Sequence, residues 1–167
     1  MNIAIMAHDN RKELMLQFCT AYLGTLSKHH LCSTLATGAY VSQQTGLKIE
    51  TVLHGVSGGH EQIGARIDLN EIDLVLLFLD PQASDYGKLM SYFSQKCDRN
   101  TIPLATNSGS AEALLLALGR GDLDWREVMK SKVKPQTSTE QRATVNKAQT
   151  QIGYFAIRFQ RQRAVAR

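Results

Sequence analysis

Five short apolar segments recur through the first 119 residues, and each is followed by a turn signal and then by a helical pattern. They span residues 2–6, 31–35, 48–53, 72–79 and 102–105. Strands that alternate with helices over short connections require right-handed crossovers, which give a parallel sheet with helices on both faces. The pattern therefore predicts an α/β protein with a doubly wound, Rossmann- or flavodoxin-like sheet of five strands.

The same arrangement predicts where a ligand binds. Open parallel sheets bind ligands beyond the carboxyl ends of their strands, so the polar residues that follow the strands should lie near one another. These residues are His8, Asp9, Thr37, Gly38, residues 54–61, Asp80 and residues 106–108. His29 and His30 precede a strand instead, and we expect them at the opposite edge of the sheet in a structural or solvated role.

Charge is distributed unevenly along the chain. Nineteen Lys and Arg residues against fifteen Asp and Glu give a formal charge of +4. Residues 1–129 hold ten bases and fourteen acids, whereas residues 130–167 hold nine bases and a single acid, Glu140. The excess positive charge belongs to one terminal segment, so it does not predict a nucleic-acid-binding domain. We predict a domain at 1–129 and a basic linker with a C-terminal helix at 130–167.

The C-terminal helix is predicted from four apolar residues at spacings of four, three and four: Ala148, Ile152, Phe155 and Phe159. Residues 130–139 have the composition of an exposed linker. The apolar face is typical of a helix that docks on its own domain or on another subunit. Contact of the basic face with an anionic partner is the alternative.

Targeting signals and cysteine pairs are missing from the sequence. No run of eighteen apolar residues is present to cross a bilayer, and the start MNIAIMAHD lacks the charged flank and cleavage site of a signal peptide. We therefore predict a cytoplasmic protein with no membrane partner. Cys19, Cys32 and Cys97 fit neither a disulfide framework nor a zinc site, and we expect reduced, buried thiols and no metal.

Glycines and hydrogen-bond donors after the strands indicate a phosphate site. Gly55, Gly58 and Gly59 would let backbone N–H groups approach an anion, although glycine clusters also mark plain turns. A helix that begins near His60 would direct its positive end at the same point. Further donors at this edge are the side chains of Lys12, Thr34, Thr37 and Ser57.

Acid–base groups stand at the ends of two strands. His8 and Asp9 could orient a carbonyl or hydroxyl group of a substrate, while Asp9 could equally cap the helix that follows. Asp80 comes after a strongly apolar strand, and desolvation there would raise the pKa of its carboxyl and suit it to acid–base work. A turn-forming role beside Pro81 is the alternative.

Six segments resemble the methylglyoxal synthase family in order and spacing. They are Ala7-His8-Asp9-x-x-Lys12, Ala36-Thr37-Gly38, Gly55-x-x-Gly58-Gly59-x-x-Gln62-x-Gly64, Ile72-Asp73-Leu74-Val75, Asp80-Pro81 and Ile102-Pro103-x-Ala105-Thr106-Asn107. The resemblance covers residues 1–119 and implies a homohexamer that needs no metal or organic cofactor. It also implies a reaction that converts dihydroxyacetone phosphate to methylglyoxal and inorganic phosphate through an enediolate.

The resemblance implies roles for several site residues, and at some of these positions this chain differs from the family. The resemblance implies that His8, Asp9 and Lys12 bind substrate, and that Asp80 is the acid after the fourth strand. His60 stands where the family has an aspartate as principal base, and His54 replaces a serine. The family's histidine-containing loop after Asp80-Pro81 is shorter here, and its polar side chains include Asp85 and Tyr86.

We accordingly predict a protein that binds a small phosphorylated three-carbon metabolite, with phosphate-eliminating lyase activity as one outcome of binding. A non-catalytic sensor or regulatory subunit of the same fold is the alternative, and a lyase or isomerase with another substrate is the third hypothesis. The expected partners are the metabolite or inorganic phosphate and further copies of the chain. The predicted catalytic residues are His60, Asp80, His8 and Asp9, and the predicted binding residues are Lys12, Thr34, Thr37, Gly38, His54, Gly55, Ser57, Gly58 and Gly59.

Overall fold

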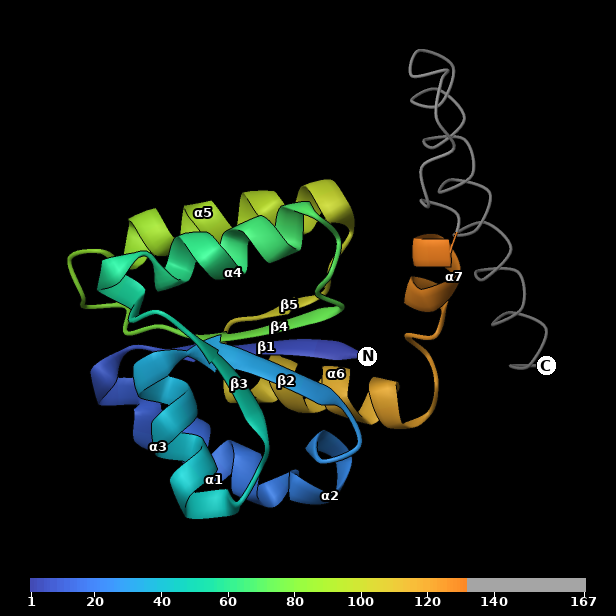
Figure 1. Ribbon diagram of the computed structural model, residues 1–167, viewed down its shortest axis with the longest axis horizontal. Coiled ribbons are helices and arrows are strands. Elements are labelled where there is room, and N and C mark those ends of the chain that lie inside the picture. The colour runs from blue at the N-terminus through green and yellow to red at the C-terminus, as the bar shows by residue number, and fades with distance from the viewer. Residues whose placement is uncertain (132–167) are drawn as a thin grey trace, which may run out of the picture. The chain divides into compact units, whose positions relative to one another are not determined.

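A sheet of five parallel strands forms the centre of the protein in a computed structural model, which describes residues 1–131 (Figure 1). The strands lie in the order β3-β2-β1-β4-β5. They are β1 (Asn2–Ala7), β2 (His30–Thr34), β3 (Ile49–Val52), β4 (Leu74–Phe78) and β5 (Leu104–Ala105). This arrangement confirms the doubly wound α/β fold that the sequence predicts.

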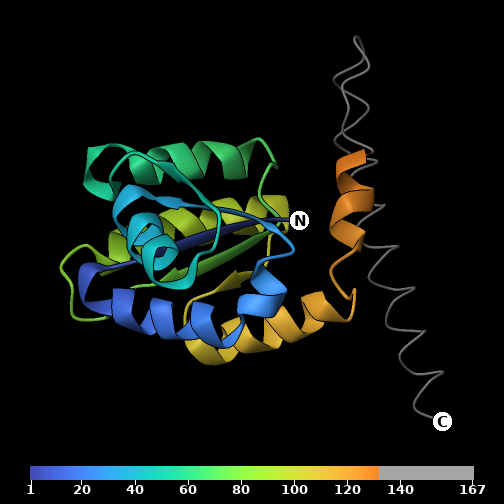
Figure 2. The ribbon, with the colours of Figure 1, turned by 60° about the horizontal axis from the view of Figure 1, so that its bottom comes forward.

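Helices cover both faces of the sheet, as Figure 1 and Figure 2 show. Helices α4 and α5 lie on one face, and α1, α3 and α6 lie on the other. The helices are α1 (Lys12–Ala21), α2 (Leu23–Leu26), α3 (Leu35–Thr45), α4 (Gly59–Asp68), α5 (Tyr86–Asn100), α6 (Ser108–Gly119) and α7 (Trp125–Ser131). Two short 3₁₀ turns, Asp9–Arg11 and Gly55–Ser57, precede α1 and α4.

Two hydrophobic cores fill the space between the sheet and its helices, because successive side chains of a strand point to opposite faces. The core on the α1 side includes Ile3, Ile5, Met15, Phe18, Leu74, Leu76, Phe78 and Leu115. The core on the α4 side includes Ala4, Met6, Ile63, Val75, Leu77 and Phe93. All five residues of β4 are buried, as expected of a strand with helices on both faces.

The strand order reverses between β1 and β4, which pair with each other from Ile3 and Leu74 to Ala7 and Phe78. Beyond the last of these pairs, the backbone N–H of His8 donates a hydrogen bond to the Phe78 carbonyl at 3.1 Å. Doubly wound sheets bind ligands in the crevice at such a reversal, on the carboxyl side of the strands. The fold therefore places the segments after β1 and β4 at the expected ligand position.

The opposite, amino end of the sheet is held by Arg126 of α7, whose side chain is 1% exposed. Its guanidinium donates hydrogen bonds to the carbonyls of Asn100 and Ile72 at 2.8 and 2.9 Å and to the Asn70 side chain at 2.6 Å. It lies 3.7 Å from the buried carboxylate of Asp73. One arginine thus joins α7 to the segments that precede β4 and β5.

Three further sequence predictions can be compared with the described residues. Helix α7 includes Lys130 and Ser131, which we predicted from the sequence to lie in the linker, so the division at 129/130 stays a prediction. The four apolar residues expected on the C-terminal helix lie outside the described residues. Within residues 1–131, the structure has no helix of the length and apolar character that crossing a membrane requires.

The cysteines are free and buried, as predicted. Burial raises the pKa of Cys19 and Cys97 to about 12 and that of Cys32 to about 11. Because the thiolate is the reactive form of cysteine, these thiols are inert at neutral pH. They serve as packing residues of the cores.

Candidate functional site at the carboxyl ends of the strands

His8 follows β1 directly and has a defined tautomer. Its Nδ1 accepts a hydrogen bond from the backbone N–H of Asp80 at 3.0 Å, so the proton of the neutral ring lies on Nε2. Nε2 is buried and has no hydrogen-bond partner among residues 1–131; the Oδ1 atom of Asp85 lies 3.6 Å away, beyond hydrogen-bond distance. A buried N–H group without an acceptor is well suited to donate to a substrate oxygen.

His60 is the second residue of α4, and its ring is held between two neighbours. The ring makes an edge-to-face contact with Phe93, with centroids 5.9 Å apart. On the Gly55 side the approach is close, because a Cβ atom on Gly55 would stand 2.7 Å from His60 Cε1. The absence of a side chain at Gly55 is therefore needed for this position of the imidazole.

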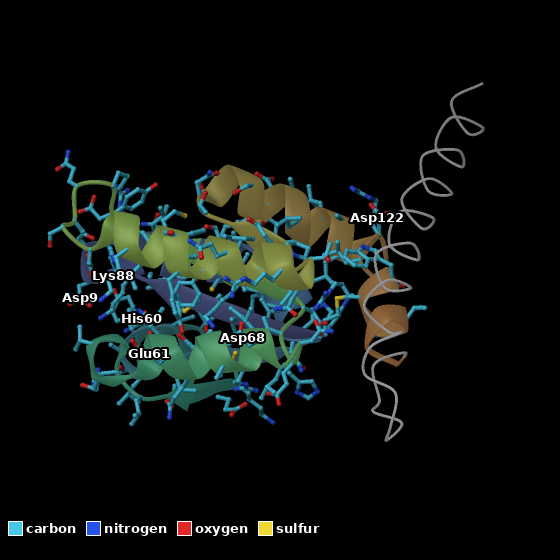
Figure 3. All side chains as sticks on the ribbon, turned by 90° about the horizontal axis from the view of Figure 1, so that it is seen from above. Asp9, His60, Glu61, Asp68, Lys88 and Asp122 are labelled. Carbon is cyan, nitrogen blue, oxygen red and sulfur yellow. The ribbon has the colours of Figure 1, made fainter. Side chains whose placement is uncertain are left out.

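Burial lowers the pKa of His60 below its ordinary value of 6.5. Glu61 and Asp85 act in the opposite direction with smaller effects, and His8 adds to the lowering. His60 is therefore neutral at pH 7, the form in which an imidazole accepts a proton. Figure 3 shows His60 and Glu61 near Asp9 and Lys88, at the end of the molecule opposite Asp122.

Asp80 differs from the sequence prediction, which gave it a raised pKa. Its pKa is lowered, because its carboxylate accepts hydrogen bonds from the backbone N–H of Gln82 at 3.0 Å and from the side chain of Asn10. The guanidinium of Arg11, 3.6 Å away, adds to the lowering. These partners hold Asp80 ionised, while its own backbone N–H orients His8, so the predicted rise in the pKa of Asp80 was wrong.

Asp9 lies on the 3₁₀ turn before α1 and pairs with Lys12, whose Nζ is 2.6 Å from the Asp9 carboxylate. The Lys12 ammonium lowers the pKa of Asp9. The alternative prediction, that Asp9 caps the helix that follows, was wrong. Helix α1 begins at Lys12, and neither α1 nor the 3₁₀ turn before it has a side-chain hydrogen bond at its N-cap. His8 and His54 also act electrostatically on Asp9, which places these groups in one region.

In the loop that leads into α4, backbone N–H groups that the sequence predicted for a ligand donate hydrogen bonds within the loop. The backbone N–H groups of Ser57 and Gly59 both donate to the His54 carbonyl, at 3.0 and 2.8 Å. Gly58 has φ = 98°, a conformation that favours glycine, and a Cβ on Gly59 would stand 2.1 Å from the Leu53 carbonyl oxygen. The amides of Ser57 and Gly59 thus close the turn, and the prediction that Gly59 turns its N–H toward an anion was wrong.

The residues at the start of α3 are packed against the sheet. Thr34 and Thr37 are buried, and the Thr37 hydroxyl donates to the Ala7 carbonyl at 3.2 Å, next to His8. A Cβ on Gly38 would stand 2.6 Å from Thr51 of β3, so this glycine lets α3 approach the strands. Thr37 therefore lies beside the end of β1, with its proton already used by the protein.

Three neighbours of the site were not predicted as functional. Asn10 donates a hydrogen bond to Asp80, and Arg11 forms an ion pair with it. Both residues directly follow His8 and Asp9 at the end of β1, and this position could have indicated from the sequence that they belong to the site. Phe93 packs against His60 from α5, but its sequence pattern indicates only a core position. Among residues 1–131, no group of three or more His, Cys, Asp or Glu side chains is placed to hold a metal ion.

Comparisons with known proteins agree with this fold. Residues 15–106 match the family model described as an MGS-like domain. The chain is 45% identical over 139 residues to a methylglyoxal synthase of Caldicellulosiruptor saccharolyticus, covering 83% of this chain and 99% of the relative. It is 46% identical over 133 residues to a methylglyoxal synthase of Oceanobacillus iheyensis, covering 79% and 95%. The crystal structure of methylglyoxal synthase from Elizabethkingia anophelis matches with a TM-score of 0.60 and 29% identity, over 68% of this chain and 76% of that one.

Proposed function

The chain belongs to the MGS-like family, and from this membership and the site geometry we propose that it eliminates phosphate from dihydroxyacetone phosphate or a similar three-carbon phosphate ester. The observation that carries the proposal is the pair of histidines at the carboxyl end of the sheet. His60 is a neutral imidazole, and His8 carries its proton on a buried Nε2. A proton acceptor and a hydrogen-bond donor are the two groups that enediolate formation needs.

In the proposed reaction, His60 removes a proton from the hydroxymethyl carbon beside the substrate carbonyl. The electron pair of that C–H bond forms the enediolate, and Nε2–H of His8 donates a hydrogen bond to the carbonyl oxygen as it becomes negative. The hydroxyl of the enediolate then gives up its proton and becomes the aldehyde carbonyl, the C–C double bond shifts toward the phosphate-bearing carbon, and the C–O bond to the ester oxygen breaks so that phosphate leaves with that electron pair. The resulting enol takes up a proton at carbon and becomes methylglyoxal. The protein supplies only acid–base groups and hydrogen bonds, so the proposal requires no cofactor.

For the phosphate group, we propose Lys12 and the exposed His54 as the charged contacts, with the start of α3 and the loop before α4 beside them. Lys12 now pairs with Asp9, and a dianionic ester would compete for its ammonium group. The other predicted binding residues stay as proposed contacts of the same pocket: Thr34, Thr37, Gly38, Gly55, Ser57 and Gly58.

Turnover of dihydroxyacetone phosphate tests the proposal. We expect methylglyoxal and inorganic phosphate to appear in equal amounts and at the same rate. His60→Ala should lower that rate by about 10²- to 10⁴-fold, as loss of a positioned base does. A matched surface control is Gln95→Ala on α5, because the Gln95 amide contacts Ser91 of its own helix, and this variant should keep the parental rate. Absence of products, or full activity of His60→Ala, would contradict the proposal.

Binding without turnover is the second candidate function. The observation that favours it is the engagement of two of the carboxylates in this region, because Asp9 pairs with Lys12 and Asp80 with Asn10 and Arg11. Such a protein would sense a phosphorylated metabolite and would not consume it. Saturable thermal stabilisation by inorganic phosphate, with no product from dihydroxyacetone phosphate, would support this function, since a ligand of the native state raises its stability.

Assembly and compartment complete the proposal. We propose that the chain forms a homo-oligomer, a hexamer by resemblance to its family, and that it acts in the cytoplasm. Sedimentation of the full chain measures the first, and fractionation of the source cells measures the second.

A further inference from the structure

A groove opens at the amino end of the sheet, away from the candidate active site. It has a volume of about 970 Å³ and lies where β2 and β3 begin, beside α2 and the end of α3. Small-molecule sites have volumes of about 300 to 1,000 Å³. The groove is therefore large enough to receive a small organic ligand, and no residue of the proposed reaction lines it.

Its apolar lining comes from leucines that are part of the hydrophobic core. Leu26, Leu31 and Leu47 are at most 4% exposed, and all three line the groove. Leu23 of α2 also lines it and is 39% exposed, so one large apolar side chain meets solvent there. An apolar group of a ligand would cover this surface and be removed from water.

The polar lining includes two lysines and two histidines. Lys28, His29 and His30 come one after another from the connection between α2 and β2, and Lys48 comes from the connection before β3. The acidic side chain in the lining, Glu50, pairs with Arg66 at 3.1 Å. The lysines thus provide positive charge that no acid of the lining balances.

His29 contributes hydrogen bonding more than charge. Burial, the N-terminal amine and Lys28 lower the pKa of His29, against smaller opposing effects of Asp73 and Glu127. His29 is therefore neutral at pH 7. The serine and threonine hydroxyls of the lining are already used, because Ser42 donates to the Leu47 carbonyl and Thr45 to the Val41 carbonyl.

We propose that this groove binds a small amphipathic anion, with its carboxylate or phosphate group at Lys28 and Lys48 and an apolar chain or ring on the leucines. The proposal does not depend on the proposed function, because the two sites lie at opposite ends of the strands. Charge complementarity selects the anion, and the exposed side chain of Leu23 selects an apolar group attached to it. A cation with the same apolar chain would lack the favourable contact with the lysines, and an anion without such a chain would lack the apolar contact.

Titration of the full chain with four probes tests the proposal. Octanoate and octyl phosphate carry both parts, octylamine carries the chain with the opposite charge, and acetate carries the charge without the chain. The readout is the amide chemical shift of groove residues such as Leu31 and Leu47, measured beside those of the candidate active site. We expect octanoate or octyl phosphate to shift the groove amides saturably, and octylamine and acetate to bind at least about tenfold more weakly.

Charge variants locate the head group. Lys28→Gln and Lys48→Gln should each weaken octanoate about 2- to 5-fold, the effect of one exposed ion pair. Lys88→Gln on α5 is the matched control and should not change binding. All three replace exposed side chains, and their thermal unfolding checks that the fold is kept.

Three results would overturn the proposal. The first is equal binding of octylamine and octanoate, and the second is the same loss of affinity in Lys88→Gln as in the groove variants. The third is a set of groove amides that respond to protein concentration and not to the anions, which would identify this face as a contact between copies of the chain. Turnover of dihydroxyacetone phosphate has no part in these outcomes, so failure here leaves the proposed function untouched.

Discussion

The two ends of β1 show two different uses of buried polar groups. At its amino end, the backbone N–H of Asn2 donates to the buried carboxylate of Asp73 at 2.8 Å, beside the guanidinium of Arg126. At its carboxyl end, His8 presents a buried Nε2 with no acceptor among the described residues. Buried polar groups cost stability unless they are paired. Arg126 Nε at the amino end also has no hydrogen-bond partner among the described residues, but the other guanidinium nitrogens of Arg126 donate four hydrogen bonds. The amino end of the sheet is therefore joined by hydrogen bonds between distant segments, while the His8 Nε2–H at the carboxyl end has no acceptor among the described residues.

The amino end should show the largest effect on stability. Arg126→Ala removes four hydrogen bonds and the cationic neighbour of Asp73, and the expected loss is about 3–5 kcal/mol of unfolding free energy. Chemical denaturation measures it. Arg120→Ala is the matched control, because the Arg120 pair with Asp122 is exposed and should contribute about 0–1 kcal/mol. Equal effects of the two variants would remove the distinction between the ends.

The carboxyl end should show its largest effect on turnover. His8→Ala removes the Nε2–H donor, and the expected loss is about 10²- to 10³-fold in kcat for phosphate release, as for one oxyanion donor. Its unfolding free energy should change by much less than that of Arg126→Ala, about 1 kcal/mol, because the Asp80 N–H loses one acceptor. A variant with normal kcat would show that His8 has only a structural role.

A smaller effect is expected where the backbone touches His60. Gly55→Ala would place a Cβ 2.7 Å from the His60 ring and should displace the imidazole at a cost of about 1 kcal/mol or less, because the obstructing atoms are at the end of a side chain that can rotate away. Gly24→Ala is the matched control, because no atom lies within 4 Å of the added Cβ. It should be neutral or stabilising, since alanine favours helix more than glycine. Denaturation and the histidine NMR spectrum measure both effects.

The smallest effect concerns pH, and each end of the sheet contributes one histidine. Burial lowers the pKa of His60 and of His29, so the unfolded chain binds a proton at a higher pH than the native protein does. Stability should therefore fall as the pH decreases from about 6.5 toward the pKa values of these histidines in the native protein. Above that range the two histidines should not make stability depend on pH, because both are neutral in the folded and the unfolded chain. His60→Gln and His29→Gln should each flatten the decline measured by thermal unfolding. A decline that is unchanged in both variants would contradict the burial of these rings.

The fold was predictable because its signal is repeated. Five apolar segments alternate with helical patterns, and the parallel topology follows from handedness once that alternation is seen. The observed ends of the strands differ from the predicted ends by one or two residues; β2, for example, spans His30–Thr34, and the prediction was 31–35. The hydrogen bonds that Arg126 makes to distant segments were not predicted. A buried arginine has no characteristic sequence pattern, and its partners are far from it in the sequence.

The site was predictable in position but only partly in chemistry. The rule of strand carboxyl ends selected His8, Asp9, Asp80 and residues 54–61, and the resemblance assigned His60 the position of the base. The state of each group depends on hydrogen bonds that sequence does not show, such as the Asn10 and Gln82 contacts that keep Asp80 ionised. The same limit applies to glycines, because only the structure reveals that Gly59 passes the Leu53 carbonyl.

The protonation states of two imidazoles test the central claim most directly. Nitrogen-15 NMR of histidine-labelled protein at pH 7, with and without dihydroxyacetone phosphate, reports the state and tautomer of each ring. We expect a neutral His60 and a His8 ring protonated on Nε2, with both sets of signals shifting saturably as the ester is added. A protonated His60 at pH 7, a His8 proton on Nδ1, or signals that the ester leaves unmoved would contradict this claim.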